Sequence, residues 1–178
     1  MKKSLFVPIV AILSAAAILL AASFALNNVA EKTAQKKHLE LMQTLLPDSK
    51  SFLKEAYDGE DTNIRTVHKG DSGFVIETVT AGYADDIRML IGVNNDGKVT
   101  GLVILDMAET FGLGATALTD HEFLSQFLNT SGEASVGGDI DAISGATVTS
   151  KAIVRSVNSA VAYVTGADAD SAATSWGG

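Results

Sequence analysis

At 178 residues the chain is long enough for one modest globular domain and a short additional segment. It contains no cysteine, which excludes disulfides, iron–sulfur ligation and thiolate metal sites. Residues 1–37 hold five lysines and one acidic residue, whereas the rest of the chain has 8 basic and 20 acidic side chains and a net charge of −12. Such a domain is a poor candidate for binding nucleic acid. The histidines show no metal-ligand spacing: His38, His68 and His121.

The N-terminal segment predicts a membrane anchor. Lys2 and Lys3 precede an uncharged stretch, Leu5–Leu26, which is long enough to cross the hydrocarbon core of a bilayer as a helix. The alternative is a cleaved signal peptide with a small-x-small site at Ser23–Ala25. The apolar region of a signal peptide is usually shorter than Leu5–Leu26, so a retained helix is favoured. The lysines before the span favour a cytoplasmic N-terminus, and three lysines just beyond the span count against that orientation.

The next segment, Asn28–Leu46, contains no helix breaker and is predicted to continue as a helix until Pro47. This segment has a narrow apolar stripe formed by Leu39, Met42, Leu45 and Leu46. The stripe either packs on the core of the chain's own domain, which is the favoured interpretation, or contacts a partner subunit. We therefore expect four regions along the chain, namely a transmembrane anchor at 1–30, a juxtamembrane helix at 31–47, a globular domain at 48–165 and a disordered tail at 166–178.

After a polar loop at Asp58–Asn63, the pattern changes to that of β-strands. Residues 74–81 are β-branched and partly alternating, and residues 86–93 form a second predicted strand. Asn94–Gly97 predicts a hairpin turn, because Asp-Gly supplies the positive φ that a type I′ turn needs, and residues 98–105 then return antiparallel. The sequence therefore predicts an α+β fold in which helices pack on an antiparallel sheet.

Glycine and small residues dominate the stretch Ala108–Leu118. This composition lets the backbone approach a planar ligand closely, and it is equally typical of a flexible connector. Beyond it, Asp120–Leu128 predicts a short helix whose apolar stripe contains Phe123, Leu124 and Phe127.

The last predicted helix follows the heptad Ser144–Ser150, which reads Ser-Gly-Ala-Thr-Val-Thr-Ser. The first turn of a helix has unpaired N–H groups and the positive end of the helix dipole, so an anion can dock there. Thr147 and Thr149 offer hydroxyls that could carry a phosphate ester, but Ser144 or Thr147 could also simply be the N-cap. The apolar residues recur at the spacing of a core-facing helix: Ile153, Val154, Val157, Ala160, Val161 and Val164.

Asp141-x-x-Ser-Gly-Ala-Thr-x-Thr-Ser resembles the flavinylation motif of the FMN-binding domain family. Two further stretches agree with it, because Gly82–Gly101 looks like the two-strand core of that family and Glu109–Gly114 looks like its flavin-contacting loop. With its N-terminal apolar segment and short length, the chain is similar to the G subunits of Rnf-type electron-transport complexes over roughly residues 1–164. Three motifs in the same order make the resemblance specific.

The resemblance implies that FMN is attached covalently, through its phosphate, to a threonine. Thr147 is the expected attachment residue and Thr149 the alternative, and Asp141 lies where the flavin transferase would recognise the motif. Phe111 stands where the family commonly has proline, so its ring could lie along the flavin. The other expected cofactor-binding residues are Glu109, Thr110, Gly112, Leu113, Gly114, Ser144, Gly145 and Ala146.

The sequence has no catalytic triad, P-loop or dinucleotide-binding fingerprint, so we expect no substrate turnover from the isolated chain. The resemblance implies an electron-relay subunit of a membrane complex that couples ferredoxin:NAD oxidoreduction to sodium or proton translocation. Its partners would be other integral membrane subunits, with the flavin domain on the extracytoplasmic side of the cell membrane. A free-standing extracytoplasmic flavoprotein electron carrier and a non-redox structural or binding module are the alternatives.

Overall fold

The computed structural model describes residue 23 and residues 32–107 and 120–166. The chain divides into two compact units, Met1–Glu40 and Leu41–Gly178. Residues 32–45 are helical. The other elements all belong to the second unit: β1 (Phe52–Glu55), β2 (Ile64–Gly70), β3 (Gly73–Ala81), β4 (Asp86–Asn94), β5 (Val99–Met107), α2 (His121–Ser125) and α3 (Thr147–Thr165).

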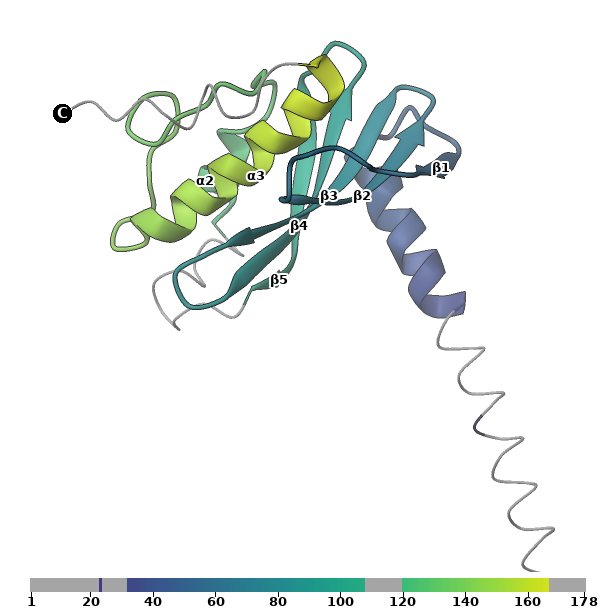
Figure 1. Ribbon diagram of the computed structural model, residues 1–178, viewed down its shortest axis with the longest axis horizontal. Helices are drawn as coiled ribbons and strands as arrows, with labels where there is room; N and C mark the ends of the chain where they lie inside the picture. The colour runs from purple at the N-terminus through teal and green to yellow at the C-terminus, as the bar shows by residue number, and fades with distance from the viewer. Residues whose placement is uncertain (1–22, 24–31, 108–119, 167–178) are drawn as a thin grey trace, which may run out of the picture. The chain divides into compact units, whose positions relative to one another are not determined.

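In the described residues, the five strands form an antiparallel sheet in the order β1-β2-β3-β4-β5, so each strand pairs with the next one along the chain (Figure 1). The longest unbroken pairing joins β3 to β4, from Gly73 opposite Asn94 to Ala81 opposite Asp86. The predicted α+β class, an antiparallel sheet packed by helices, is confirmed.

The turn between β4 and β5 differs from the predicted type. The N–H of Asn94 donates to the carbonyl of Lys98 at 2.9 Å, and Gly97 alone among the loop residues has a positive φ, of 75°. A type I′ turn needs positive φ at both central residues, so that prediction is wrong. The Asn94 side chain accepts the N–H groups of Asp96 and Lys98, at 3.0 and 2.9 Å, and so stabilises a three-residue loop that ends in a left-handed glycine.

Helix α3 covers one face of the sheet (Figure 1). Ile153 and Val157 are fully buried and pack in the same cluster as Ile76 of β3 and Ile91 of β4. The apolar stripe predicted for this helix is confirmed, with Val164 partly buried at its end. The helix therefore has a fixed position on the sheet, because its whole apolar side is removed from water.

Residues 41–46 pack on the opposite face of the sheet. Met42, Leu45 and Leu46 are buried together with Val75 of β3 and Leu90 of β4. The Thr100 hydroxyl donates to the carbonyl of Leu45 at 2.6 Å. The stripe Met42–Leu46 therefore packs on the chain's own domain, as the favoured interpretation predicted, whereas Leu39 in the first unit is exposed.

Strands β1 and β2 were not predicted. β1 has only four residues, and its central pair Leu53 and Lys54 is exposed, so its pattern is too short to indicate a strand. In β2, the buried residues Ile64 and Val67 are three positions apart rather than two. The pairing of β2 with β3 is irregular between Ile64 and Thr66, which breaks the period-two pattern of a regular strand. The loop expected at Asp58–Asn63 does connect these strands.

Helix α2 is shorter than the predicted span Asp120–Leu128, because it ends at Ser125 and residues 126–129 form turns. Its start is as expected from the sequence, since the Asp120 carboxylate accepts the N–H of Phe123 at 2.9 Å as an N-cap. Phe123 and Phe127 are buried, with their rings in an edge-to-face arrangement.

No helix within residues 32–107 and 120–166 is long and apolar enough to cross a membrane. The predicted span Leu5–Leu26 lies outside the described residues except for Ser23, and the predicted tail lies outside them from residue 167 onward.

Candidate functional site

A tight turn leads into helix α3. The N–H of Ala146 donates to the carbonyl of Ile143 at 2.9 Å, and Gly145 has a φ of 79°. A positive φ at the third position only is the signature of a type II turn, which favours glycine at that position. The Ser-Gly-Ala part of the motif is therefore a chain reversal that presents Thr147 as the first residue of the helix.

Ser150 anchors this turn to the helix. Its hydroxyl accepts the N–H of Ile143 at 3.1 Å and donates to the carbonyl of Ala146 at 3.0 Å, and the side chain is fully buried. These two bonds join both ends of the turn to the first turn of α3. This role of Ser150 was not predicted from the sequence, although a serine at the fourth helical position can hydrogen-bond back to the preceding turn.

The other end of the motif is held by Gln126. The N–H of Asp141 donates to the Gln126 side-chain oxygen at 2.7 Å, and the Gln126 amide donates to the carbonyl of Asp141 at 3.5 Å. The Asp141 carboxylate is exposed. The sequence did not indicate Gln126, because its contact with Asp141 depends on where the segment after α2 is placed in three dimensions.

Among the described residues, no side chain caps the start of α3. The N-cap position is occupied by Ala146, which has no side-chain acceptor, and the first turn contains no acidic residue. The alternative in which Ser144 or Thr147 is an ordinary N-cap is therefore wrong. The first N–H groups of the helix and the positive end of its dipole face a turn with no built-in anion.

The two candidate hydroxyl-bearing threonines differ in exposure. Thr147 is exposed, as are Ser144 and Gly145, whereas Thr149 is 1% exposed and Ala146 is also buried. Two residues correspond to about 200° around a helix, so the hydroxyls of Thr147 and Thr149 lie on opposite sides of α3. Of these two threonines, only Thr147 stands where a bulky group could be attached without displacing the core.

Two cations follow Thr147 along the same side of α3. Lys151 and Arg155 are exposed and are four and eight residues beyond Thr147, which is the spacing of neighbouring helix turns. The arrangement favours an anion at Thr147, because an anion there would offset both the dipole and the nearby positive charge.

The structure brings Asp141, Ser144, Gly145, Ala146, Thr147 and Thr149 together around the start of α3. The other expected cofactor-binding residues, together with Phe111, lie outside the described residues: Glu109, Thr110, Gly112, Leu113 and Gly114. In the described residues no group of His, Cys, Asp or Glu could hold a metal ion.

Comparison with known proteins matches residues 82–162 to the FMN-binding domain family. The chain is also 34% identical over 173 residues to the G subunit of the ion-translocating oxidoreductase complex of Methanosarcina acetivorans, covering 89% of this chain and 92% of that relative. The chain belongs to the family of G subunits of ion-translocating oxidoreductase complexes. The resemblance inferred from the sequence motifs is thereby confirmed.

Two other relatives in this family carry more specific names. The G subunit of the Na⁺-translocating ferredoxin:NAD⁺ oxidoreductase complex of Acetobacterium woodii is 35% identical over 98 residues, and that of the proton-translocating complex of Clostridium ljungdahlii is 38% identical over 99 residues. These matches cover 50% and 52% of this chain, and the matched part spans about half the length of both relatives, 47% and 53%.

The segment shared with the FMN-binding domain family starts just before β4 and ends within α3. It therefore includes the hairpin, the stretch 108–119, the Gln126 contact and the whole turn at Ser144–Thr147. In this member of the G-subunit family, β1, β2 and β3 extend the sheet beyond that shared segment.

Proposed function

We propose that this chain carries one FMN joined through its phosphate to the hydroxyl of Thr147. The observation that supports this most directly is the exposed Thr147 hydroxyl at the uncapped N-terminus of α3, on a turn held by Ser150 and Gln126. A phosphodiester retains one negative charge, which the N–H groups and the helix dipole would stabilise. The dipole contributes only about 0.3–1 kcal/mol at an exposed site, so the covalent bond is what retains the cofactor.

Thr149 is the less suitable acceptor on physical grounds. Its side chain is almost completely buried between α3 and the domain, so an ester there would require the helix to leave the core. The exposed Asp141 carboxylate, held at its backbone by Gln126, is proposed as a recognition point for the flavin transferase.

The segment Glu109–Gly114, which precedes α2 in the sequence, is proposed to contact the flavin. Glu109 and Thr110 would hydrogen-bond its polar edge or ribityl chain, and Gly112, Leu113 and Gly114 would lie against it. This part of the proposal rests on the resemblance to the FMN-binding domain family and on the match that includes this segment.

The proposed role of the chain is electron relay. A flavin exchanges one or two electrons, and this chain would hold it, orient it and prevent its loss by dissociation. The names of the relatives from Acetobacterium woodii and Clostridium ljungdahlii support a place in a complex that links ferredoxin:NAD oxidoreduction to sodium or proton translocation. The partners would be the other membrane subunits of that complex.

Attachment is tested by intact mass and by flavin fluorescence in a denaturing gel, with the full chain expressed with and without a flavin transferase. The wild-type chain should gain the mass of FMN less one water, only when the transferase is present. Thr147→Ala should abolish both the added mass and the fluorescence, while Thr149→Ala should retain them. Fluorescence retained by Thr147→Ala and lost in Thr149→Ala would move the attachment site by two residues.

The relay is tested in membranes that contain the whole complex. Thr147→Ala should stop ferredoxin-driven NAD reduction while the chain still co-purifies with the other subunits. Full NAD reduction by a complex that contains the flavin-free variant would overturn the relay proposal.

A further inference from the structure

Three aromatic side chains meet near the C-terminal end of α3. The rings of Tyr57 and Phe74 each lie edge-on to the ring of Tyr163, with centroids 5.8 and 5.7 Å apart. All three side chains are half-buried, whereas Leu53 on the edge strand β1 is 70% exposed. Leu53, Lys69 and Phe74 are cross-strand partners in one row of the sheet. We call Leu53, Tyr57, Phe74 and Tyr163 the aromatic patch.

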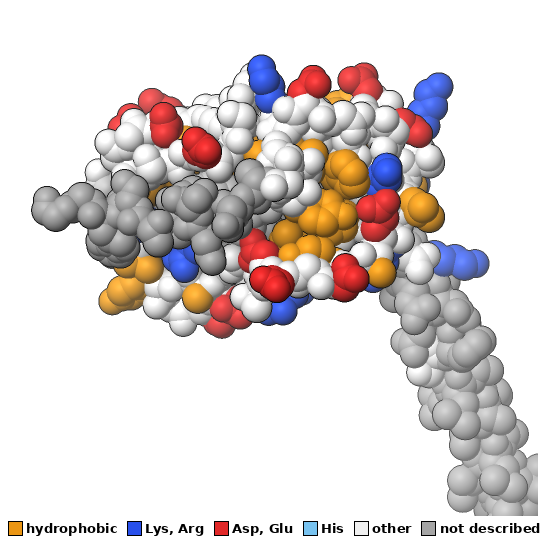
Figure 2. Space-filling view, turned by 45° about the horizontal axis from the view of Figure 1, so that its top comes forward, with side chains coloured by type: hydrophobic (Ala, Val, Ile, Leu, Met, Phe, Trp, Pro, Cys, Tyr) orange, Lys and Arg blue, Asp and Glu red, His pale blue; other side chains and the backbone are white. Residues whose placement is uncertain are grey.

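Acidic side chains surround the aromatic patch. Asp58 and Glu60 in the adjoining loop are exposed, and Glu55 lies beside Tyr163. Burial raises the pKa of Tyr163, and the negative charge of Glu55 raises it further. Burial also raises the pKa of Tyr57, with the charges of Asp61, Asp58 and Glu60 adding to the effect. Figure 2 shows hydrophobic side chains left uncovered on one face of the domain, with acidic side chains around them.

The patch is held rigidly. The Tyr57 hydroxyl donates to the carbonyl of Asp61 at 3.2 Å and accepts the N–H of the same residue at 3.1 Å. A Cβ at Gly59 would lie 2.6 Å from the Tyr57 ring, so only glycine lets the loop pass this closely over the ring. Since these side chains are already ordered, a partner that docks here loses little additional conformational entropy.

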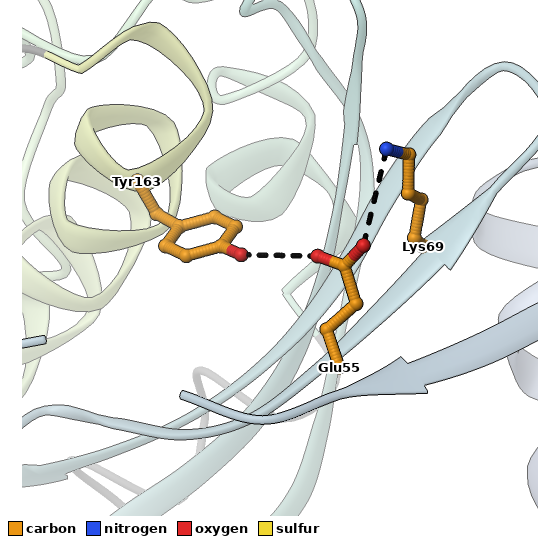
Figure 3. A network of polar contacts seen from close by, with 3 residues as sticks. All are labelled: Glu55, Lys69 and Tyr163. Carbon is orange, nitrogen blue, oxygen red and sulfur yellow. Dashed lines mark hydrogen bonds and ion pairs between the residues drawn. The ribbon is translucent and has the colours of Figure 1, made fainter. Parts of the chain in front are cut away.

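A polar network fixes the other side of the patch. The Tyr163 hydroxyl donates to the Glu55 carboxylate at 3.3 Å, and the Lys69 ammonium lies 3.9 Å from the other oxygen of that carboxylate (Figure 3). The same ammonium lies 5.6 Å from the centre of the Phe74 ring. One lysine therefore stands among four acidic side chains, Glu55, Asp58, Glu60 and Asp61, and the surface around the rings is negatively charged.

We propose that the aromatic patch and its acidic border bind a protein surface on which lysine or arginine side chains surround an apolar side chain. Half-exposed, ordered aromatic residues are typical of the residues that dominate binding energy in interfaces. A border of one charge selects a partner of the opposite charge. A second copy of this acidic chain would place like charges opposite each other, and an anionic lipid surface would be repelled in the same way.

The location of the patch indicates what its partner would do. Tyr163 is 16 residues beyond Thr147 on α3, so about 24 Å of helix separates the patch from the proposed flavin attachment. The start of α3 therefore lies outside the aromatic patch itself. That the partner is another subunit of the oxidoreductase complex rests on the proposed function. The patch would then serve assembly of the complex rather than direct contact with the flavin.

The test uses the full chain expressed together with the other subunits of its complex. Asp58→Lys combined with Glu60→Lys should lower the yield of co-purified subunits at least about tenfold, because like charges across an interface cost several kcal/mol. Leu53→Ser, which removes an exposed apolar side chain from the edge of the sheet, should also lower it. The matched control is Glu133→Lys with Asp139→Lys, which makes the same change in net charge at exposed positions elsewhere and should leave the yield unchanged.

Flavin fluorescence in a denaturing gel is read in parallel on each variant, so loss of docking is distinguished from loss of flavin attachment. A photo-crosslinking amino acid at position 53 should join the chain to another subunit within a lysine- or arginine-bearing segment, and the same amino acid at position 133 should not. Wild-type yields from both the Asp58/Glu60 and the Leu53 variants would overturn the proposal. So would crosslinks only between copies of this chain or only to lipid.

Discussion

At the scale of single residues, the candidate site depends on a glycine that no other residue replaces without strain. Gly145 has a φ of 79°, and an ordinary side chain in the left-handed region costs about 1–2 kcal/mol. Its conformation directs the chain from Ile143 into α3, so the exposure of Thr147 depends on it.

Gly145→Ala is therefore expected to reduce flavin attachment and to lower the free energy of unfolding by about 1 kcal/mol. Gly137→Ala is the matched control, because Gly137 also has a positive φ, of 84°, and a Cβ there would meet nothing within 4 Å. Both variants should lose similar stability in urea unfolding, but only Gly145→Ala should lose fluorescence in a denaturing gel. Equal fluorescence from the two variants would show that the turn at Gly145 is not required for flavin attachment.

The tyrosines of the aromatic patch predict how stability changes at alkaline pH. The pKa of Tyr163 is raised in the folded chain above its ordinary value of 10.0, mainly by burial and then by Glu55. Above pH 10 the unfolded chain loses this proton before the folded chain does, so the free energy of unfolding falls as the pH rises toward the folded-state pKa. Well below pH 10, Tyr163 is protonated in both the folded and the unfolded chain, so it does not contribute to the pH dependence of the free energy of unfolding.

Tyr163→Phe should therefore make the free energy of unfolding decline less steeply with pH from 10 upward, while also losing the hydrogen bond to Glu55. Urea unfolding at intervals between about pH 8 and pH 11.5 measures the two slopes. Identical slopes for the variant and the wild-type chain would contradict a raised pKa of Tyr163 in the folded chain.

At the scale of elements, helix α3 both covers the core and presents the candidate site. Its buried side includes Ile153 and Val157, and its exposed side includes Thr147, Lys151 and Arg155. Because the buried side fixes the position of the helix on β3 and β4, it also fixes where the N-terminus of the helix is presented.

Ile153→Ala should destabilise the domain by about 2–5 kcal/mol, because the removed side chain is fully buried and leaves a cavity. Leu128→Ala, at a residue 45% exposed, should cost much less and serves as the control. Thermal and urea unfolding of the two variants provide the comparison. A loss for Ile153→Ala no larger than that of the control would mean that α3 is not docked on the sheet.

At the scale of the whole molecule, the charge distribution and the N-terminal sequence predict where the domain lies. The lysines before Leu5–Leu26 favour a cytoplasmic N-terminus, and together with the family resemblance they predict that the residues after the predicted span lie outside the cytoplasm. The proposed covalent attachment would suit this predicted location, because a dissociating cofactor would be lost there.

A reporter enzyme that is active only outside the cytoplasm should therefore be active when fused after Thr165. The same reporter fused ahead of Lys2 should be inactive, since that end is expected to stay in the cytoplasm. Activity at Thr165 of a reporter that works only in the cytoplasm would contradict the proposed topology. The proposed relay outside the cytoplasm would then lose the support of that topology.

The sequence by itself determined the features that arise from neighbouring residues. The strands of the β4–β5 hairpin, the start of α2 near Asp120 and the core stripe of α3 were predicted, because each depends on residue spacing along the chain. The motif from Asp141 to Ser150 was found for the same reason. By contrast, β1 and β2 could not be predicted, since a short edge strand and an irregular pairing leave no regular pattern.

Only the tertiary structure decided the features that join distant parts of the chain. It placed Gln126 against Asp141, buried Thr149 while leaving Thr147 exposed, and gathered Leu53, Tyr57, Phe74 and Tyr163 into one patch. A sequence pattern records which residues are near along the chain. Which of two threonines faces water, and which aromatic rings meet, depends instead on how α3 packs on the sheet, because burial is set by the elements that come together in space.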